Sequence, residues 1–202
     1  MTVFDSPLPP SLVALFERKK TFTVAGREVP LEGNVSLEEA LALYRAVQAI
    51  APAVSAETGF AQGVSTVAIL KAHADLPKGV HHVIDPFQSH YGDAGLAAVA
   101  QAGLGDFLRF HRRLAEEVLP GLPPLQFAFI DSSHLFDLTI TEFVLVDRKL
   151  EVGGVVAFHD TWMPALQGVV RYLLANRAYE LVRDYDSPLP APAARVRPGF
   201  QS

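Results

Sequence analysis

The sequence contains no cysteine among its 202 residues. Disulfide bonds, thiolate nucleophiles and cysteine-ligated metal sites are therefore excluded. The chain has no apolar run long enough to span a membrane. Its N-terminus has no basic segment followed by an apolar run, so no secretory signal is evident. We expect a cytoplasmic protein that has no membrane partner.

Positive charge is also scarce. The chain has 17 Lys and Arg residues against 22 Asp and Glu residues, a net charge of −5. The pairs Lys19-Lys20 and Arg112-Arg113 are too short to form a basic patch, so we do not expect nucleic acid as a partner. Hydrophobic residues make up 50% of the chain and charged residues 19%. This composition excludes a disordered or fibrous chain, and the length suits one globular domain.

The most informative stretch is a glycine-containing turn at residues 57–65, Glu-Thr-Gly-Phe-Ala-Gln-Gly-Val-Ser. An apolar run precedes it and a helical pattern follows, which predicts a strand, a tight turn and a helix N-terminus. The spacing differs from the Gly-x-Gly-x-x-Gly dinucleotide motif and from the Gly-x-Ser-x-Gly hydrolase motif. On this motif alone, a ligand-binding turn and a purely structural turn are both open.

The first 35 residues predict an N-terminal arm with a short helix at 11–16 and a small hairpin at 21–30. Ser36-Leu37-Glu38-Glu39 is a capping box, and the run to Ala51 predicts an amphipathic helix. We therefore expect residues 36–202 to form the main domain, preceded by the arm of residues 1–35.

Short β-like runs then alternate with helical patterns, an order that predicts a parallel sheet covered by helices on both faces. Strands are expected at 53–57, 80–85, 107–110, 126–131, 154–159 and 179–182, and helices at 64–74, 93–102, 114–119, 135–150 and 165–176. Residues 187–198 are rich in Pro and Ala. We expect them to form a poor strand or a tail.

In open α/β sheets, ligands bind beyond the carboxyl ends of the strands. The second predicted strand ends at Asp85, directly before Pro86. A carboxylate there can bind a ribose diol or simply begin a turn, and the spacing leaves both open. His81 and His82 open the same strand at its other end, where we expect surface or edge positions.

Asp131, His159 and Asp160 follow two further strands. Singly, each is read more simply as a helix cap or a strand-end residue. Because the carboxyl ends of parallel strands share one sheet edge, the three side chains should converge there. Carboxylates with one imidazole suit a hard or borderline divalent ion such as Mg²⁺ or Mn²⁺. Taken together, the three positions favour an ion site.

In this order, the motifs resemble the class I S-adenosylmethionine-dependent methyltransferases, in the branch of small-molecule O-methyltransferases of the catechol and sugar type. The residues that carry the resemblance are Glu57-x-Gly59-x-x-x-Gly63-x-Ser65, Phe129-Ile130-Asp131-x-x-His134 and the run 150–160 with its Gly-Gly pair. The resemblance covers roughly residues 36 to 182. It implies an α/β, Rossmann-like, doubly wound and mostly parallel sheet of about seven strands with helices on both faces.

The resemblance also implies S-adenosylmethionine as the cofactor and a role for individual residues. The positions it assigns are Glu57, Gly59, Phe60, Gly63 and Ser65 for the methionine part, Asp85 for the ribose, and Pro86, Phe87 and Ala115-Glu116 for the adenine. Asp131 would lie between the cofactor amine and a divalent metal. The remaining metal ligands would be His159 and Asp160.

Two positions depart from the family pattern. Ser133 stands where many metal-dependent relatives have a second acid, which leaves His134 as the best-placed general base, with Asp131 as its catalytic neighbour. His159 stands where many relatives have an acid, and a neutral imidazole should bind a hard ion more weakly. A metal-assisted reaction and a metal-free, histidine-assisted reaction are both open.

We therefore predict an S-adenosylmethionine-dependent methyltransferase that methylates a hydroxyl of a small-molecule acceptor. Ser133 and the unusual C-terminus motivate a first alternative, a methyltransferase-like binding protein that lacks chemistry. A second alternative is a metal-dependent hydroxylase on the same fold. The N-terminal extension is a candidate contact for a homodimer.

Overall fold

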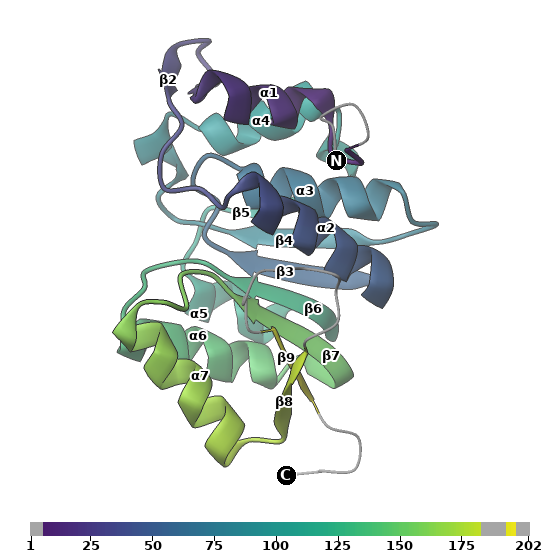
Figure 1. The fold of residues 1–202 in the computed structure, drawn as a ribbon, viewed down its shortest axis with the longest axis vertical. Coiled ribbons are helices and arrows are strands. Elements are labelled where there is room, and N and C mark those ends of the chain that lie inside the picture. Colours follow the sequence, from purple (N-terminus) through teal and green to yellow (C-terminus); the bar gives the residue numbers. More distant parts are fainter. Residues whose placement is uncertain (1–5, 183–192, 197–202) are drawn as a thin grey trace.

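The computed structural model describes residues 6–182 and 193–196. A seven-stranded sheet in the order β5-β4-β3-β6-β7-β9-β8 forms its centre (Figure 1). The strands are β3 (Val54–Thr58), β4 (Val80–Ile84), β5 (Leu108–His111), β6 (Leu125–Ile130), β7 (Leu150–Phe158), β8 (Tyr179–Val182) and β9 (Ala193–Val196). Strands β5, β4, β3, β6 and β7 are parallel, whereas β9 runs antiparallel to both β7 and β8. The predicted fold class is confirmed.

Helices cover both faces of the sheet. One layer contains α2 (Leu37–Ile50), α3 (Val64–Ala74) and α4 (Ala94–Ala102), with α1 (Pro10–Arg18) packed outside it; the other contains α5 (Ala115–Val118), α6 (Phe136–Asp147) and α7 (Pro164–Asn176). Along β6, Phe127 and Phe129 pack into the first layer, and Ala128 and Ile130 pack into the second. This alternation is the side-chain period of a strand that is buried on both faces.

Within the described residues, the connections contain three short 3₁₀ helices, η2 (Gln88–Tyr91), η3 (Gly105–Phe107) and η4 (Leu119–Gly121). The strand order reverses between β3 and β6, whose carboxyl ends lie side by side. In an open α/β sheet this switch point is where ligands bind. The glycine-containing turn follows β3, and Asp131 follows β6, so both predicted motifs lie there.

The capping box at the start of α2 is present. The Ser36 hydroxyl accepts a hydrogen bond from the Glu39 backbone N–H, and the Glu39 carboxylate accepts one from the Ser36 backbone N–H at 2.7 Å. The helix ends at Ile50, and Ala51 follows with a left-handed φ of +50°. The predicted helix over residues 36–51 is confirmed, and it packs against α3 and β6.

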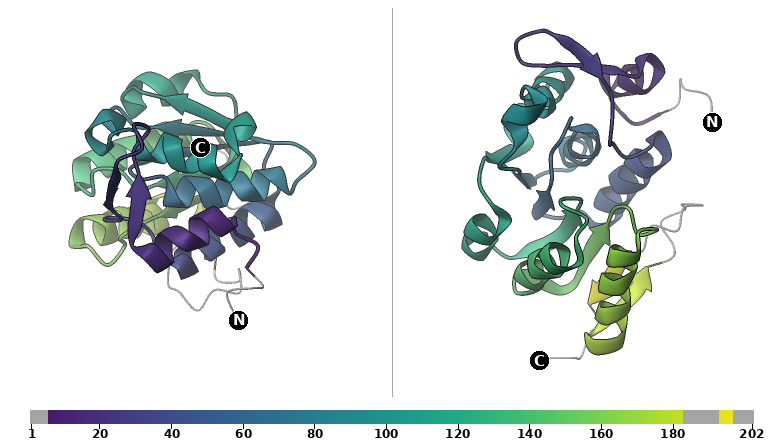
Figure 2. Two further views of the ribbon diagram at one scale, coloured as in Figure 1. Left: turned by 90° about the horizontal axis from the view of Figure 1, so that it is seen from above. Right: turned by 90° about the vertical axis from the view of Figure 1, so that its left-hand side faces the viewer.

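The N-terminal strands β1 (Lys20–Phe22) and β2 (Glu28–Pro30) form an antiparallel pair, as the hairpin prediction required. Strand β1 and α1 lie against α4, outside the first helix layer (Figures 1 and 2). In the described part of the chain, no helix is both long and apolar enough to cross a membrane.

Most predicted helix and strand boundaries agree with the structure within two residues, and two around residue 150 differ by more. The helix expected to end at Leu150 ends at Asp147, and Leu150 begins β7, which was expected to begin at Gly154. The pairing between β6 and β7 shifts register after Leu125, which allows the strand to continue through the irregular segment before Val155. Strand β9 lies within the predicted poor strand or tail at 187–198. The remainder of that segment is outside the described residues.

Candidate active site

Two glycines allow the turn after β3 to approach its neighbours. Gly59 has φ +90°, and a Cβ at this position would lie 1.9 Å from the backbone oxygen of Asp131. Gly63 has φ +84°, and a Cβ there would lie 2.9 Å from the Cα of Gly95. Any larger residue at either position would force two backbone segments apart. The glycines therefore let the ends of β3 and β6 and the start of α4 meet around one space.

That space is a cavity of about 320 Å³. Ten of the eleven residues predicted to bind the cofactor line it: Gly59, Phe60, Gly63, Ser65, Asp85, Pro86, Phe87, Ala115, Glu116 and Asp131. The eleventh is Glu57, which does not line the cavity. His134 is also at the wall, whereas His159 and Asp160 are not. The structure thus gathers these predicted residues from four separate segments around one volume.

Asp85 organises the turn from the end of β4. Its Oδ2 atom accepts hydrogen bonds from the backbone N–H groups of Phe60 (3.2 Å) and Ala61 (3.1 Å), and from Nε2 of Gln88 (3.2 Å). Its Oδ1 atom accepts one from the Phe87 N–H at 2.7 Å. A carboxylate has about four acceptor positions, two on each oxygen. Only Oδ1 therefore has an acceptor position left for a ligand, one rather than the two that a whole ribose diol would use.

Glu57 is fully buried behind the turn. Its carboxylate accepts hydrogen bonds from the hydroxyls of Ser65 and Thr66, the latter at 2.5 Å, and so ties the end of β3 to the first turn of α3. His81 Nε2 lies 3.1 Å from the same carboxylate. Burial, with the nearby charges of Asp131 and Asp85, raises the pKa of Glu57 to about 8 against the opposing hydrogen bonds.

The prediction that His81 lies at the surface or an edge is wrong. The side chain is completely buried, and its Nδ1 atom lies 2.8 Å from the Ser55 hydroxyl, which in turn lies 2.6 Å from Nε2 of His73. Burial lowers the pKa of both His81 and His73 to about 3. The polar side chains form a continuous chain from Glu57 to His73 through the core, where each partner offsets the cost of burying the next. For His82 the surface-or-edge prediction is closer, since its ring is half-buried and stacks on His111.

Several residues at the cavity were not predicted. Asn34 and Val35 of the N-terminal segment line it. Gln62 holds that segment to the turn, because its amide oxygen accepts from the Glu32 N–H at 2.9 Å and its Nε2 donates to the Pro30 carbonyl at 2.8 Å. Glu142 of α6 also lines it, held by the hydroxyls of Thr58 (2.9 Å) and Ser132 (2.6 Å). Only the pairing of distant segments reveals these positions.

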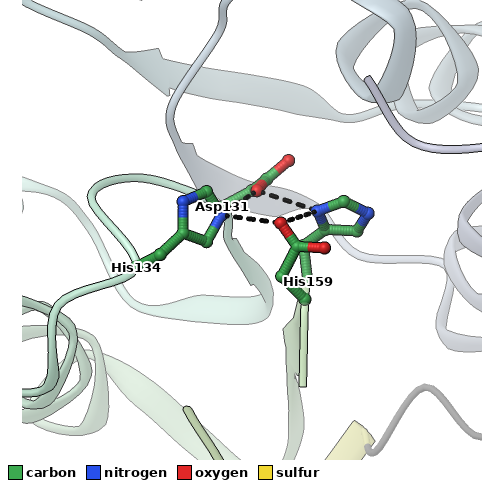
Figure 3. A group of neighbouring side chains, drawn as sticks. Asp131, His134 and His159 are labelled. Carbon is green, nitrogen blue, oxygen red and sulfur yellow. Dashed lines mark hydrogen bonds and ion pairs between the residues drawn. The ribbon is translucent and has the colours of Figure 1, made fainter. Parts of the chain in front are cut away.

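Beside the cavity, four titratable side chains converge. They are Asp131, His134, His159 and Asp160, and a possible ligand atom of each lies within 4.8 Å of the others. Three were the predicted metal ligands, and His134 was the predicted base. Figure 3 shows the rings of His134 and His159 approaching the Asp131 carboxylate from opposite sides. His134 and Asp160 have left-handed φ values of +57° and +49°, so the backbone is held in an uncommon conformation at both positions.

In this cluster, the carboxylates raise the pKa values of the histidines, and the histidines lower the pKa values of Asp131 and Glu39. Burial by itself lowers the pKa of His159, but contacts with Asp131 and Glu39 outweigh burial and raise that pKa to about 10. Contact with Asp131 likewise raises the pKa of His134. Burial opposes ionisation of Asp131, yet hydrogen bonds from the two imidazoles hold its pKa below the ordinary value. The hydrogen bond from His159 lowers the pKa of Glu39 to about 2. If a divalent cation displaces the proton of each ring nitrogen that faces the carboxylates, the two nitrogens and two carboxylate oxygens make a donor set that fits it.

A glycine turn at the switch point of a doubly wound sheet, with a cavity beside it and an acid at the next strand end, is typical of nucleotide-cofactor-binding α/β proteins. The family described as "Methyltransferase domain" matches residues 56–161, just over half of the chain. The chain belongs to this methyltransferase family. The predicted identity as an S-adenosylmethionine-dependent methyltransferase is confirmed. No curated protein sequence matches the chain.

Solved structures share the fold. The S-adenosylhomocysteine-bound methyltransferase PaMTH1 of Podospora anserina is 16% identical with a TM-score of 0.74, over 94% of this chain and 89% of that one. Cofactor-bound Rv0187 from MTB is 17% identical with a TM-score of 0.72, over 98% and 93%. The O-methyltransferase TomG from Streptomyces achromogenes, in complex with SAM, is 19% identical with a TM-score of 0.65, over 93% and 90%.

Proposed function

We propose that the protein transfers the methyl group of S-adenosylmethionine to a hydroxyl of a small-molecule acceptor. The observation that supports this most is the common cavity: ten predicted cofactor positions line it, and Asp131 and His134 connect it to the cluster of Asp131, His134, His159 and Asp160. The cofactor and the acceptor would meet at this junction. Two structures with the same fold are named O-methyltransferases, TomG and the Bacillus cereus enzyme.

In this proposal, the turn and its surroundings hold the cofactor. Because Gly59 and Gly63 have no side chains, the methionine part of the cofactor would lie close to the backbone of the turn. The remaining acceptor position on Asp85 Oδ1 would bind the ribose. Pro86, Phe87 and Glu116 surround the adenine. Glu57 acts from behind, because it positions Ser65 and the start of α3. Most of the rate would come from holding the methyl donor in line with the acceptor oxygen.

Asp131, His159 and Asp160 would hold a divalent cation at the junction. When bound, such a cation supplies Lewis acidity that lowers the pKa of an acceptor hydroxyl. In a metal-free variant of the reaction, His134 would take the hydroxyl proton instead, with Asp131 orienting its ring at 3.1 Å. Either way, the proton leaves the acceptor at this cluster, beside the cavity.

The test is calorimetric titration of S-adenosylmethionine and S-adenosylhomocysteine into the protein. We expect saturable binding that Asp85→Ala abolishes and that the matched control Asp106→Ala, on an exposed 3₁₀ turn, leaves unchanged. A panel of hydroxylated acceptors, assayed for S-adenosylhomocysteine release, then tests turnover, which Asp131→Ala should abolish. Normal turnover in Asp131→Ala would contradict the site.

The same experiments separate the alternatives. Tight cofactor binding with no demethylation across the panel would indicate a methyltransferase-like binding protein. The pair of imidazoles in the cluster favours a second candidate, because two histidines and a carboxylate are a common ligand set for non-haem iron oxygenases. Oxygen consumption that requires Fe²⁺ and a reductant would indicate that hydroxylase.

A further inference from the structure

In the cluster of Asp131, His134, His159 and Asp160, the ring nitrogens have fewer hydrogens than the close nitrogen–oxygen contacts they make. His134 Nε2 lies 3.1 Å from Asp131 Oδ1 and 3.2 Å from Asp160 Oδ2. His159 Nδ1 lies 3.1 and 3.3 Å from the same two oxygens. A ring nitrogen carries at most one hydrogen, so two hydrogens would have to serve four close contacts. The four atoms form a closed ring of alternating nitrogen and oxygen that hydrogen bonding alone satisfies poorly.

Coordination of one cation would use all four atoms at once. Bonds of about 2.0–2.2 Å from a single ion to nitrogen and oxygen ligands put neighbouring ligand atoms roughly 3 to 3.5 Å apart. The four nitrogen–oxygen separations of 3.1 to 3.3 Å lie in that range. The donor atoms are therefore spaced as ligands of one ion, and His134 is among them.

The second nitrogen of His159 has a partner of its own. Nε2 lies 3.5 Å from Glu39 Oε2, on the opposite side of the ring from the cluster. A proton on Nε2 that faces this carboxylate leaves the Nδ1 lone pair free for a cation, an arrangement that fixes the tautomer of metal-binding histidines. The capping box holds Glu39 in place through the Ser36 N–H. The helix cap of α2 thus also orients a site residue.

We propose that this site binds a divalent transition-metal ion that accepts imidazole ligands, in preference to Mg²⁺, through Asp131, His134, His159 and Asp160, with Glu39 as the positioning residue. The inference rests on the proposed function, of which it specifies the metal. Mg²⁺ prefers oxygen ligands and gives up its water reluctantly, whereas imidazole suits Fe²⁺, Zn²⁺ and their neighbours. His134 is then a ligand rather than a free base, which selects the metal-assisted reaction.

The experiment measures metal binding directly, on the purified full-length protein after removal of metals with EDTA. Co²⁺ and Mg²⁺ are titrated in separate calorimetric experiments, and the visible absorption of bound Co²⁺ reports nitrogen ligation. We expect Co²⁺ to bind more tightly than Mg²⁺ by on the order of 100-fold, in line with the preference of imidazole for transition metals. Equal affinities for the two ions, or no Co²⁺ binding, would overturn the proposal.

Variants test the two new roles. His134→Asn keeps a residue that tolerates the left-handed φ and removes the imidazole, and it should weaken Co²⁺ binding at least tenfold; His111→Asn, on β5 outside the cluster, is its control. Glu39→Gln keeps the capping box, which accepts Gln, and should weaken Co²⁺ binding by about 10-fold or more. Its control is the exposed neighbour, Glu38→Gln. Unchanged Co²⁺ affinity and absorption in His134→Asn would exclude it as a ligand.

S-adenosylhomocysteine is titrated into the same samples. Binding of this compound without any preference for Co²⁺ would overturn the metal assignment and leave the proposed function intact. Selective Co²⁺ binding without S-adenosylhomocysteine binding would overturn the proposed function and leave the metal site. The two failures are therefore distinguishable.

Discussion

The buried pair of Glu57 and His81 makes the stability of the fold depend on pH. Burial raises the pKa of Glu57 to about 8 and lowers the pKa of His81 to about 3. The two groups lie 3.1 Å apart, and neither is exposed to solvent. Between those two pKa values, the folded pair holds one proton. In the unfolded chain, the corresponding pKa values are 4.5 and 6.5.

The sign of the pH dependence follows from the proton count in each state. Between pH 4.5 and 6.5, the unfolded pair also holds one proton, so the pair contributes no pH dependence. Above pH 6.5 the unfolded pair holds none, while the folded pair keeps its proton up to about pH 8. The free energy of unfolding therefore falls as the pH rises. Over this interval the loss is about 2 kcal/mol, at roughly 1.4 kcal/mol per pH unit.

Acid also destabilises the fold, because at low pH the unfolded chain holds more protons than the folded protein. Below pH 4.5 the unfolded pair holds two protons and the folded pair one. His73 adds to this effect from pH 6.5 downward, because burial lowers its pKa to about 3 and the unfolded chain protonates first. The buried side chains of Glu57, His81 and His73 together thus predict that the free energy of unfolding is largest near pH 6.5.

The assay is urea denaturation at pH 6.5 and pH 8 for the wild type and for Glu57→Gln. Glutamine has the shape of the protonated acid and does not titrate. Neighbouring carboxylates raise the pKa values of His134 and His159, so the contribution of these two residues to the free energy of unfolding also falls as the pH rises. That fall is the same in the wild type and in Glu57→Gln. We expect the wild type to lose about 2 kcal/mol more than the variant. Equal losses would refute the reasoning and mean that Glu57 is ionised in the folded protein; the exposed control, Glu38→Gln, should behave as the wild type.

Three further predictions concern the glycine turn, the N-terminal cap of α2 and a hydrogen bond between β8 and α6. Gly59→Ala should lower the free energy of unfolding by about 3 kcal/mol or more, because its Cβ would lie 1.9 Å from the backbone oxygen of Asp131. The control Gly26→Ala has φ +77° and no atom within 4 Å of the added Cβ, and should lower it by about 1 kcal/mol. Equal losses in urea denaturation would contradict the steric argument. Ser36→Ala removes a side-chain cap and should cost about 1 kcal/mol, which a thermal melt would show as a lower Tm, and an unchanged Tm would count against the cap. Tyr179→Phe removes a hydroxyl that donates to a carboxylate of α6 at 2.6 Å, and leaves that acceptor without its partner; we expect a loss of about 1–3 kcal/mol in urea, and no loss would mean that water replaces the bond.

The elements near the glycine turn could be predicted because their signals are local. The turn depends on two glycines that take positive φ values, and the start of α2 depends on the pair Ser36 and Glu39. Alternating strands and helices predicted a parallel sheet, and parallel strands bring their carboxyl ends to one edge. For this reason Asp85 and Asp131, far apart in the sequence, were both expected at the site and both line the cavity.

The errors fall where distant segments decide the outcome. His81 looked like an edge residue because it is polar and lies at the start of a strand. Its burial depends on pairing with Ser55 of β3 and on the contact of that serine with His73 of α3, neither of which a local pattern shows. For the segment that contains β9, the sequence left a poor strand and a tail both open, because the segment is rich in Pro and Ala. Strand β9 forms between two strands, whose backbone groups supply hydrogen-bond partners on both sides.

By itself, the sequence determined the fold class and the glycine turn, because periodicity, turn chemistry and strand order are properties of neighbouring residues. Most of the predicted cofactor positions, which the family resemblance implied, also line the cavity. Tertiary structure alone decided that Glu57 supports the turn from the core instead of lining the cavity. It also decided that His134 joins the three predicted ligands, and that Glu39 of α2 reaches His159. These contacts join elements that are separate in the chain, and only packing sets the distances between them.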